Sequence, residues 1–387
     1  MLSERLKRLP PYLFVEIDKL KASYIRSGRK VLDLGIGDPD LGAPQELVES
    51  LVSALQHREH HRYPPDRGLP ELLDAICEWA RDFHGVSLER NEVLVTIGSK
   101  EAIAHLPLAV ADPGDTILIP DPGYPVYNSA AIFAGAECVR FRLEEYNGYW
   151  PDFALIGSDT FKKTRLIFLN YPNNPTAVMA GVDGFREALD LCKEHGVILV
   201  NDAAYSEIYY ERPAVPLFVI ARGAGVPYIE FFSFSKTFSI TGWRVGFAIG
   251  SVEVISALAG LKANLDSGVF GAIQEATAAA LRCGFRDITS RIRSIYLERR
   301  NILAGSLERS GLLFSSPPAT FYFWIKTPEG IGSVDFCRFL LEEMGIVGTP
   351  GVGFGENGEG YFRLSITTDT ETVREAGRQL ETLPSRL

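Results

Sequence analysis

The stretch Ser233-Phe234-Ser235-Lys236-Thr237-Phe238 is the most informative part of this chain. An apolar run at 228–232 comes directly before it and predicts a buried strand. A lysine at the end of a buried strand loses part of its hydration. This lowers its pKa and makes the neutral amine available to attack a carbonyl. The alternative is an ordinary polar loop with a solvated lysine.

The neighbours of this lysine favour a phosphate as a second ligand. Ser233 and Ser235 supply neutral hydroxyl donors, and Arg244 follows Lys236 in the next short segment. A planar guanidinium beside neutral donors suits a phosphate group. A lysine that attacks an aldehyde, next to a group that binds phosphate, predicts a cofactor carrying both functions. That cofactor is pyridoxal 5'-phosphate (PLP).

The composition is that of a globular protein with one large or two medium domains. The chain has 387 residues, of which 46% are hydrophobic and 23% charged; domains usually have about 100–200 residues. The formal net charge of −10 argues against nucleic acid as the main partner, because nucleic-acid binding needs clustered positive charge. Local arginines could still bind a small anionic substrate.

The cysteines and the apolar segments give no sign of disulfides, metal binding or a membrane span. The five cysteines are scattered without a C-x-x-C pair, which favours reduced thiols in a cytoplasmic protein over disulfides or zinc ligands. We therefore expect no metal. The N-terminus lacks the apolar core of a signal peptide. No run reaches the ~18 apolar residues of a membrane span.

Two further predicted strands end in residues suited to a cofactor. The strand at 92–97 runs into Gly98-Ser99-Lys100. A strand, a glycine-serine turn and a helix form an anion site, although simple capping by Ser99 is an alternative. The strand at 115–120 leads to Tyr124, held between a glycine and a proline. Its flat ring could stack on a heteroaromatic group.

The next two predicted strands end in polar side chains. The strand at 165–169 runs into a tight turn containing Asn174, whose amide could donate to a phenolate oxygen, although asparagine is also common in such turns. The apolar run at 196–200 leads to Asp202. A buried aspartate is costly unless it is paired, and a protonated pyridine nitrogen would be such a partner. A capping role is the alternative. Tyr205 could reach the same ring.

The order of the elements predicts an α/β protein. Strands and helices alternate from 92 to 250, with polar residues at the carboxyl ends of the strands, where parallel sheets place their sites. Residues 251–311 predict long helices, and the segment 262–268 between two of them has an exposed character. From about 312 the chain alternates again between strand and helix patterns.

Two places outside this region also suggest ligand contacts. Gly35 and Gly37 follow a short predicted strand and allow the backbone to approach another group closely. Arg363 lies among apolar residues on a predicted strand at 361–366. A buried guanidinium favours a carboxylate, which is either internal or the α-carboxylate of a substrate.

Taken in order, these motifs resemble those of the class I/II aminotransferases, which are PLP enzymes of fold type I. The resemblance covers about residues 10–385 and rests on Asn170-x-Pro172-x-Asn174-Pro175-Thr176, Asp202-x-x-Tyr205, Ser233-x-Ser235-Lys236 and Arg363. It implies a large PLP-binding domain at 46–285, with a mostly parallel seven-stranded sheet between helices. Residues 286–387 would form a smaller α+β domain, which residues 1–45 join as an N-terminal arm.

The resemblance also implies roles around the cofactor ring. Lys236 would bind the cofactor aldehyde covalently and then move the proton of the substrate Cα, with Asp202 and Tyr205 as the other catalytic residues. Asp202 would pair with the pyridine nitrogen. Tyr205 and Asn174 would bond the phenolic oxygen, and Tyr124 would stack on the ring. The phosphate would be bound by Ser99, Lys100, Ser233, Ser235 and Arg244.

For the substrates and partners, the resemblance implies amino acids, 2-oxo acids and a second copy of the chain. Arg363 would bind the α-carboxylate, and Tyr63 would reach the phosphate of the neighbouring subunit in a homodimer with shared sites. The substrate contacts would come from Tyr12, Gly37, Lys100, Tyr124, Asn174, Asn264 and Arg363, with Asn264 offered across the dimer.

Within the family, the wording of several motifs is most similar to the LL-diaminopimelate aminotransferases of lysine biosynthesis. These motifs are 12–14, 34–40, 98–107, 121–127 and 350–355. The implied reaction converts tetrahydrodipicolinate and glutamate to LL-2,6-diaminopimelate and 2-oxoglutarate. Two positions depart from the pattern. After Tyr63, where a glutamate usually meets the distal ammonium, this chain has Asp66-Arg67, and Ala177 stands where glycine is common.

Two other functional classes stay open. The first keeps the cofactor but changes the reaction, to a broader aspartate, alanine or aromatic aminotransferase or to a C–S β-lyase. The second is a binding module without catalysis, such as the effector domain of a PLP-dependent transcription factor. The acidic charge and the short segment before residue 30 argue against the second class.

Overall fold

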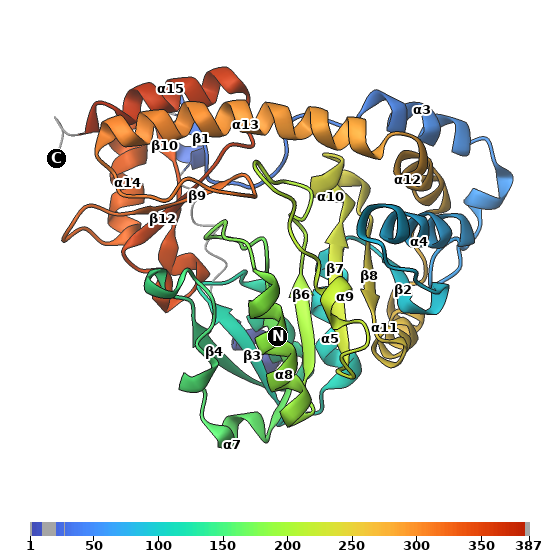
Figure 1. Cartoon of the computed structure of the whole chain (residues 1–387). Helices are drawn as coiled ribbons and strands as arrows, with labels where there is room; N and C mark the ends of the chain where they lie inside the picture. The colour runs from blue at the N-terminus through green and yellow to red at the C-terminus, as the bar shows by residue number, and fades with distance from the viewer. Residues whose placement is uncertain (1, 10–20, 27, 384–387) are drawn as a thin grey trace.

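A seven-stranded sheet forms the centre of the molecule (Figure 1). The structure, a computed structural model, describes residues 2–9, 21–26 and 28–383. The strand order is β2-β8-β7-β6-β5-β3-β4, and within the described residues β8 alone runs antiparallel to its neighbours. The predicted mostly parallel α/β sheet is thereby confirmed. The strands are β2 (Val93–Thr96), β3 (Thr116–Asp121), β4 (Glu137–Arg142), β5 (Thr164–Leu169), β6 (Ile198–Asp202), β7 (Tyr228–Ser233) and β8 (Gly246–Gly250).

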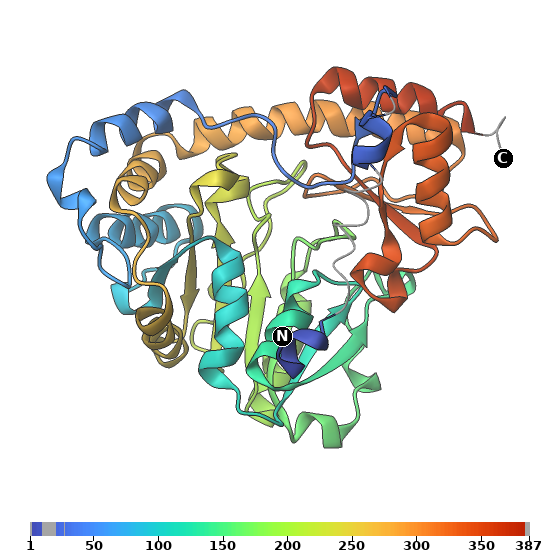
Figure 2. The same cartoon turned by 180° about the vertical axis from the view of Figure 1, so that it is seen from behind.

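Helices cover both faces of this sheet (Figures 1 and 2). Because side chains alternate along a strand, Ile117 and Ile119 of β3 join one apolar cluster while Leu118 joins the other. The cluster with the two isoleucines includes α5 (Ser99–Val110), α6 (Val126–Ala134) and α11 (Val252–Leu265). The other cluster includes α4 (Pro70–His84), α8 (Val182–His195) and α9 (Leu217–Ala221).

The C-terminal part is a smaller α+β unit. Its antiparallel sheet has the order β11-β12-β9, and a parallel pair joins β1 to β10. The helix α13 runs from the α12 side of the molecule to this unit (Figure 1). The elements of this unit are β1 (Leu32–Asp33), β9 (Tyr322–Lys326), β10 (Ile346–Val347), β11 (Thr349–Pro350), β12 (Tyr361–Ser365), α14 (Ser333–Met344) and α15 (Thr370–Leu380). α13 (Phe285–Ser310) leads to it from α12 (Gly271–Cys283).

The β1–β10 pair brings residues from near the start of the chain into the C-terminal unit. The predicted domain boundaries at 45/46 and 285/286 stay a prediction, and the second falls at the start of α13. Shorter elements used below are α1 (Glu4–Lys7), α3 (Gln45–Ala54), α7 (Ser158–Phe161), α10 (Phe234–Thr237), and the 3-10 turns η1 (Arg58–His61) and η5 (Thr241–Trp243).

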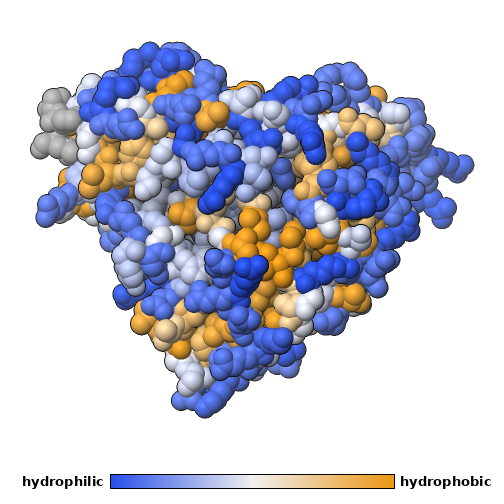
Figure 3. All heavy atoms as spheres, viewed as in Figure 1, coloured by the Kyte–Doolittle hydropathy of each residue, from blue (hydrophilic) through white to orange (hydrophobic). Residues whose placement is uncertain are grey.

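The surface is mostly polar on the face seen in Figure 3, where hydrophobic side chains gather toward the middle. The described helices include none with the length and apolar character needed to cross a bilayer. Near the start of the chain, residues 21–26 are helical.

One prediction about this fold is wrong. The segment 262–268 was expected to be exposed, but Lys262 is 0% exposed and lies 2.9 and 3.1 Å from the two carboxylate oxygens of Glu101. Residues 263–266 are exposed as expected. Lys262 lies in the last turn of α11, which packs on α5, so its ammonium reaches a carboxylate of the neighbouring helix. Such a tertiary pair is invisible in the local sequence.

Candidate active site

A cavity of about 430 Å³ opens where the carboxyl ends of the large sheet meet the smaller one. Its wall combines residues that follow β2, β3, β5, β6 and β7 with Tyr322 of β9 and Arg363 of β12. Twelve of the predicted site residues line it: Gly37, Ser99, Lys100, Tyr124, Asn174, Asp202, Tyr205, Ser233, Ser235, Lys236, Arg244 and Arg363. The fold therefore gathers residues that are scattered over more than 300 positions of the sequence.

Lys236 lies on the short helix α10, immediately after β7. Its Nζ donates to the carbonyl oxygen of Gly37 at 3.0 Å. Burial lowers the pKa of Lys236 to about 8; the Asp38 carboxylate opposes this shift, and the charges of Arg244 and Arg363 add to it. A larger fraction of neutral amine near neutral pH is what a nucleophilic lysine needs.

Asp202 ends β6 and is 4% exposed. The Tyr127 hydroxyl donates to its Oδ2 at 2.8 Å, and the backbone N–H of Ala204 donates to its Oδ1 at 3.3 Å. Burial raises the pKa of Asp202 to about 6, although both hydrogen bonds oppose the shift. The carboxylate thus does more than cap the turn. It is a buried acid that a cationic partner would stabilise.

The smaller sheet contributes a guanidinium and a phenol. Arg363 is 2% exposed; its Nη1 donates to Oδ1 of Asn174 at 2.8 Å and its Nη2 to the carbonyl oxygen of Gly35 at 2.9 Å. Its guanidinium carbon lies 4.1 Å from the ring centre of Tyr322. The hydroxyl oxygens of Tyr322 and Tyr205 are 3.0 Å apart. These contacts hold the arginine and both phenols in fixed positions.

A group suited to an anion lies where α5 begins. Gly98 caps this helix with φ of +71°, and a Cβ at Gly98 would lie 2.7 Å from Nη2 of Arg244. Gly98 therefore occupies the capping position, and Ser99 is the first helical residue. The start of a helix offers free N–H groups and the positive end of the dipole. The alternative of capping by Ser99 does not hold.

Two features of this anion group suit the binding of a ligand. Within the described residues, the buried Oγ of Ser235 has no hydrogen-bond partner. Arg244 has φ of +57°, in the left-handed region that non-glycine residues rarely adopt. Such strain is usually retained where it places a functional side chain.

Reasoning from the sequence did not find all the residues at the cavity. Tyr127 holds Asp202, Tyr322 packs on Arg363, and Asp38 lines the wall near Lys236. Tyr127 has the local pattern of an ordinary core aromatic at 0% exposure. A signal existed only for Asp38, which directly follows Gly37. The sequence also predicted that the backbone at Gly37 comes close to another group. That group is the Tyr322 side chain, because a Cβ on Gly37 would collide with the Tyr322 hydroxyl.

Three predicted site residues are not brought to this cavity. Tyr63 is 92% exposed and lines a separate surface hollow. Asn264 is exposed, and its Nδ2 donates to the carbonyl oxygen of Gly260 at 2.8 Å. Tyr12 lies outside the described residues. Since Tyr63 and Asn264 were both expected to serve a neighbouring subunit, their positions in one chain do not test that role.

The cavity residues fit PLP. An amine with a lowered pKa, a buried carboxylate and an anion group with an unpartnered serine hydroxyl match the aldehyde, the ring nitrogen and the phosphate of that cofactor. All of these groups lie in one cavity.

Comparison with known proteins identifies the family of this chain. The sequence model of the family described as "Aminotransferase class I and II" matches residues 29–380. An LL-diaminopimelate aminotransferase of Aquifex aeolicus is 46% identical over 98% of both chains. One from Moorella thermoacetica is 43% identical over 98% of this chain and 97% of its own.

Solved structures agree with this assignment. A substrate-bound BacF structure from Bacillus subtilis has a TM-score of 0.93 at 33% identity, covering 99% of this chain and 98% of its own. A variant of Thermus thermophilus aspartate aminotransferase has a TM-score of 0.92 at 29% identity, covering 99% of both chains. With the family match over most of its length, this chain belongs to the class I and II aminotransferases.

Proposed function

We propose that this aminotransferase uses PLP to transfer the amino group between glutamate and tetrahydrodipicolinate, forming LL-2,6-diaminopimelate and 2-oxoglutarate for lysine biosynthesis in the cytoplasm. The observation that carries the cofactor chemistry is the presence of Lys236 and Asp202 in one cavity, with pKa values of about 8 and about 6. Support for the substrate comes from two relatives named LL-diaminopimelate aminotransferase, which are 46% and 43% identical to this chain over nearly its whole length.

The residues around the proposed cofactor position would bind different parts of the cofactor. When bound, PLP supplies an electron-withdrawing ring that stabilises negative charge at the substrate Cα. Lys236 would hold the cofactor at its aldehyde carbon, and its amine would take the proton from the substrate Cα and return it. Asp202, ionised above about pH 6, keeps the ring nitrogen protonated. Tyr205 and Asn174 bond the phenolic oxygen, and Tyr124 stacks on the ring.

The anion group binds the phosphate of the cofactor. Arg244 supplies the charge, and the hydroxyls of Ser233 and Ser235 supply neutral donors. The first N–H groups of α5, at Ser99 and Lys100, add the field of the helix terminus. Tyr63 contributes its hydroxyl from the neighbouring subunit of a homodimer.

The α-carboxylate of the amino acid binds at Arg363. Because Nη1 of Arg363 donates to the amide oxygen of Asn174, the amide NH₂ of Asn174 would be the group left to donate to the cofactor. A planar guanidinium matches a carboxylate with two parallel hydrogen bonds. Gly37, Lys100, Tyr124 and Tyr12 complete the substrate contacts, with Asn264 from the neighbouring subunit.

The departure at Asp66-Arg67 bears directly on the distal end of the substrate. Nη2 of Arg67 donates to the carbonyl oxygen of Asn91 at 3.1 Å, so this cation is bound within its own subunit. Neither Asp66 nor Arg67 lines the cavity. With Arg67 turned away, Asp66 is the residue of this loop that could meet the distal ammonium of diaminopimelate.

The test compares substrates in full turnover. Purified PLP-loaded protein is given 2-oxoglutarate and, in turn, LL-diaminopimelate, aspartate, alanine and phenylalanine, and glutamate formation is measured. We expect kcat/KM for LL-diaminopimelate to exceed the others by at least tenfold. A preference for aspartate or an aromatic amino acid would mean that the chain is a broader aminotransferase. Pyruvate and ammonia from a cysteine thioether would identify a β-lyase.

A further inference from the structure

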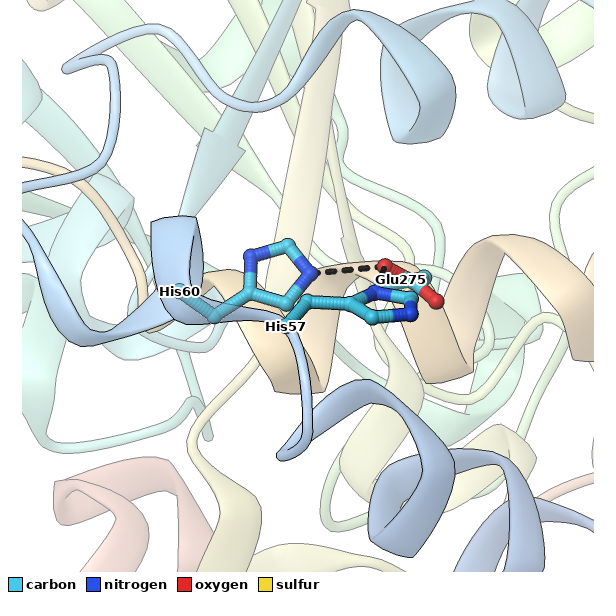
Figure 4. A group of neighbouring side chains, drawn as sticks. All are labelled: His57, His60 and Glu275. Atoms are coloured by element: carbon cyan, nitrogen blue, oxygen red, sulfur yellow. Dashed lines mark hydrogen bonds and ion pairs between the residues drawn. The ribbon is translucent and has the colours of Figure 1, made fainter.

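A cluster of two histidines and one glutamate lies outside the proposed active site (Figure 4). His57 caps the 3-10 turn η1, His60 lies within that turn, and Glu275 comes from α12. Oε2 of Glu275 is 2.6 Å from Nε2 of His60 and 3.0 Å from Nδ1 of His57. No task in the transamination falls to these three residues.

The backbone around the cluster is built to let the rings converge. Gly271 lies four residues before Glu275, so both face the same side of α12. A Cβ at Gly271 would clash with the ring of His60, which is 7% exposed. Glycine at this position therefore allows the imidazole to lie against the helix. The side chain of His57 is 45% exposed, so the cluster is also open to solvent on one side.

We propose that His57, His60 and Glu275 bind one Zn²⁺ ion. Two imidazole nitrogens and one carboxylate oxygen form a ligand set that zinc accepts, with a fourth position for water. Bonds of ~2.0–2.1 Å in a tetrahedral site place the ligand atoms about 3.3 Å apart. The present separations of 2.6 and 3.0 Å would need to open by about 0.7 and about 0.3 Å.

The surroundings favour a cation. One carboxylate oxygen of Glu275 lies within hydrogen-bond distance of a ring nitrogen of both His57 and His60, so the three ligand atoms already face one another. Glu59 and Glu71 line the same hollow of about 1190 Å³, which is wide enough to admit a hydrated ion. Zinc would replace the protons that the two imidazoles now share with Glu275.

From the sequence, no metal was predicted because the cysteines are scattered without a C-x-x-C pair, and His57 and His60 were not considered. The fold supplies Glu275 from more than 200 residues later. An ion here would join η1 to α12 and fix the base of the segment that leads to Tyr63. The inference stands apart from the choice of amino acid substrate.

The test measures zinc binding directly. The cysteines of the PLP-loaded protein are kept reduced, metal is removed with a chelator, and Zn²⁺ is titrated in equilibrium dialysis. In a second titration, the absorption spectrum of bound Co²⁺ reports which kinds of ligand hold the metal. We expect one Zn²⁺ per chain and at least tenfold weaker binding in His57→Gln and in Glu275→Gln. The matched control is His61→Gln, because His61 lies in the same turn but its ring bonds the carbonyl oxygen of Leu55 at 3.1 Å.

Three results would overturn the proposal. The first is that no stoichiometric zinc binds, and the second is that His57→Gln binds zinc as tightly as the unaltered protein. The third is a Co²⁺ absorption spectrum with a sulfur-to-metal charge-transfer band, which would show that a cysteine such as the exposed Cys283 binds the metal. If Glu275→Gln fails to fold, as judged by loss of the PLP absorbance, His57→Gln decides the matter because its ring is the exposed one.

Discussion

At the scale of single residues, the hydrogen bond from Tyr127 to Asp202 affects the charge of the carboxylate that we propose pairs with the cofactor. Burial raises the pKa of Asp202 to about 6, and the Tyr127 hydroxyl opposes this. A hydrogen bond to a charged group contributes about 1.5–3 kcal/mol, and one pKa unit corresponds to about 1.4 kcal/mol. Tyr127→Phe should therefore raise the pKa of Asp202 by about one unit.

The direction of the change in PLP affinity with pH depends on which protonation state of Asp202 pairs with the cofactor. Only ionised Asp202 pairs with a protonated ring nitrogen, so PLP affinity falls as pH falls through the pKa. In Tyr127→Phe this loss should begin about one pH unit higher, as measured by PLP titration of cofactor-free protein. Tyr171→Phe is the control, because its hydroxyl bonds the carbonyl oxygen of Tyr149 instead. An unchanged midpoint would show that Tyr127 does not tune Asp202.

Single residues also show why some departures from a family pattern are harmless. Ala177 is 1% exposed and has φ of +64°. Glycine is favoured there because a side chain in this region costs about 1–2 kcal/mol. The buried methyl group recovers about 0.8 kcal/mol of this cost. The sequence revealed the departure, but only the backbone angle explains why glycine is usual and alanine acceptable.

At the scale of elements, a buried ion pair holds the helix that carries the anion group. Lys262 of α11 meets Glu101 of α5, and Glu101 also accepts from the backbone N–H of Ile97 at the turn before α5. Removing one partner of a buried pair leaves the other charge uncompensated, at a cost of about 3–5 kcal/mol. Lys262→Met should lose stability by this amount in urea unfolding.

Two further variants separate this effect from a general one. Adding Glu101→Gln to Lys262→Met removes the stranded charge, so the double variant should recover part of the loss. Lys162→Met, at a lysine whose side chain is 72% exposed, should cost about 0.5 kcal/mol or less. Equal losses at the two lysines would refute a stabilising role for the pair.

The predictability of the elements follows from how local their causes are. The strands β2, β3, β5, β6 and β7 and the long helices within 252–310 were predicted, because apolar periodicity and turn residues are local signals. No strand was predicted at β8. Three side-chain pairs were missed, because each depends on packing between segments that are far apart in the sequence. They are Lys262 with Glu101, Tyr127 with Asp202, and His60 with Glu275. The candidate site was predictable wherever polar residues directly follow a buried strand.

At the scale of the whole molecule, the proposed dimer predicts that two defective chains can restore each other. Tyr63→Ala lacks the residue given to the neighbouring site, and Lys236→Ala lacks the lysine of its own site. Refolded together in equal amounts, half of the dimers are mixed and each holds one intact site. Activity should return to about a quarter of the unaltered level.

The control for this experiment is the same two variants mixed without unfolding, so that subunits cannot exchange. Activity should then stay near the sum of the two separate variants. If co-refolding also gives no recovery, the phosphate site is complete within one chain and the exposed Tyr63 has another role.

The most direct measurement of the central claim is a single half-reaction at Lys236. PLP-loaded protein is mixed with glutamate in the absence of any 2-oxo acid, and the absorbance of the cofactor is followed. The account predicts rapid conversion of the PLP band to that of pyridoxamine phosphate, with stoichiometric 2-oxoglutarate, and conversion slower by at least a thousandfold (~4 kcal/mol) in Lys236→Ala. Equal rates in the two proteins would contradict the role assigned to Lys236.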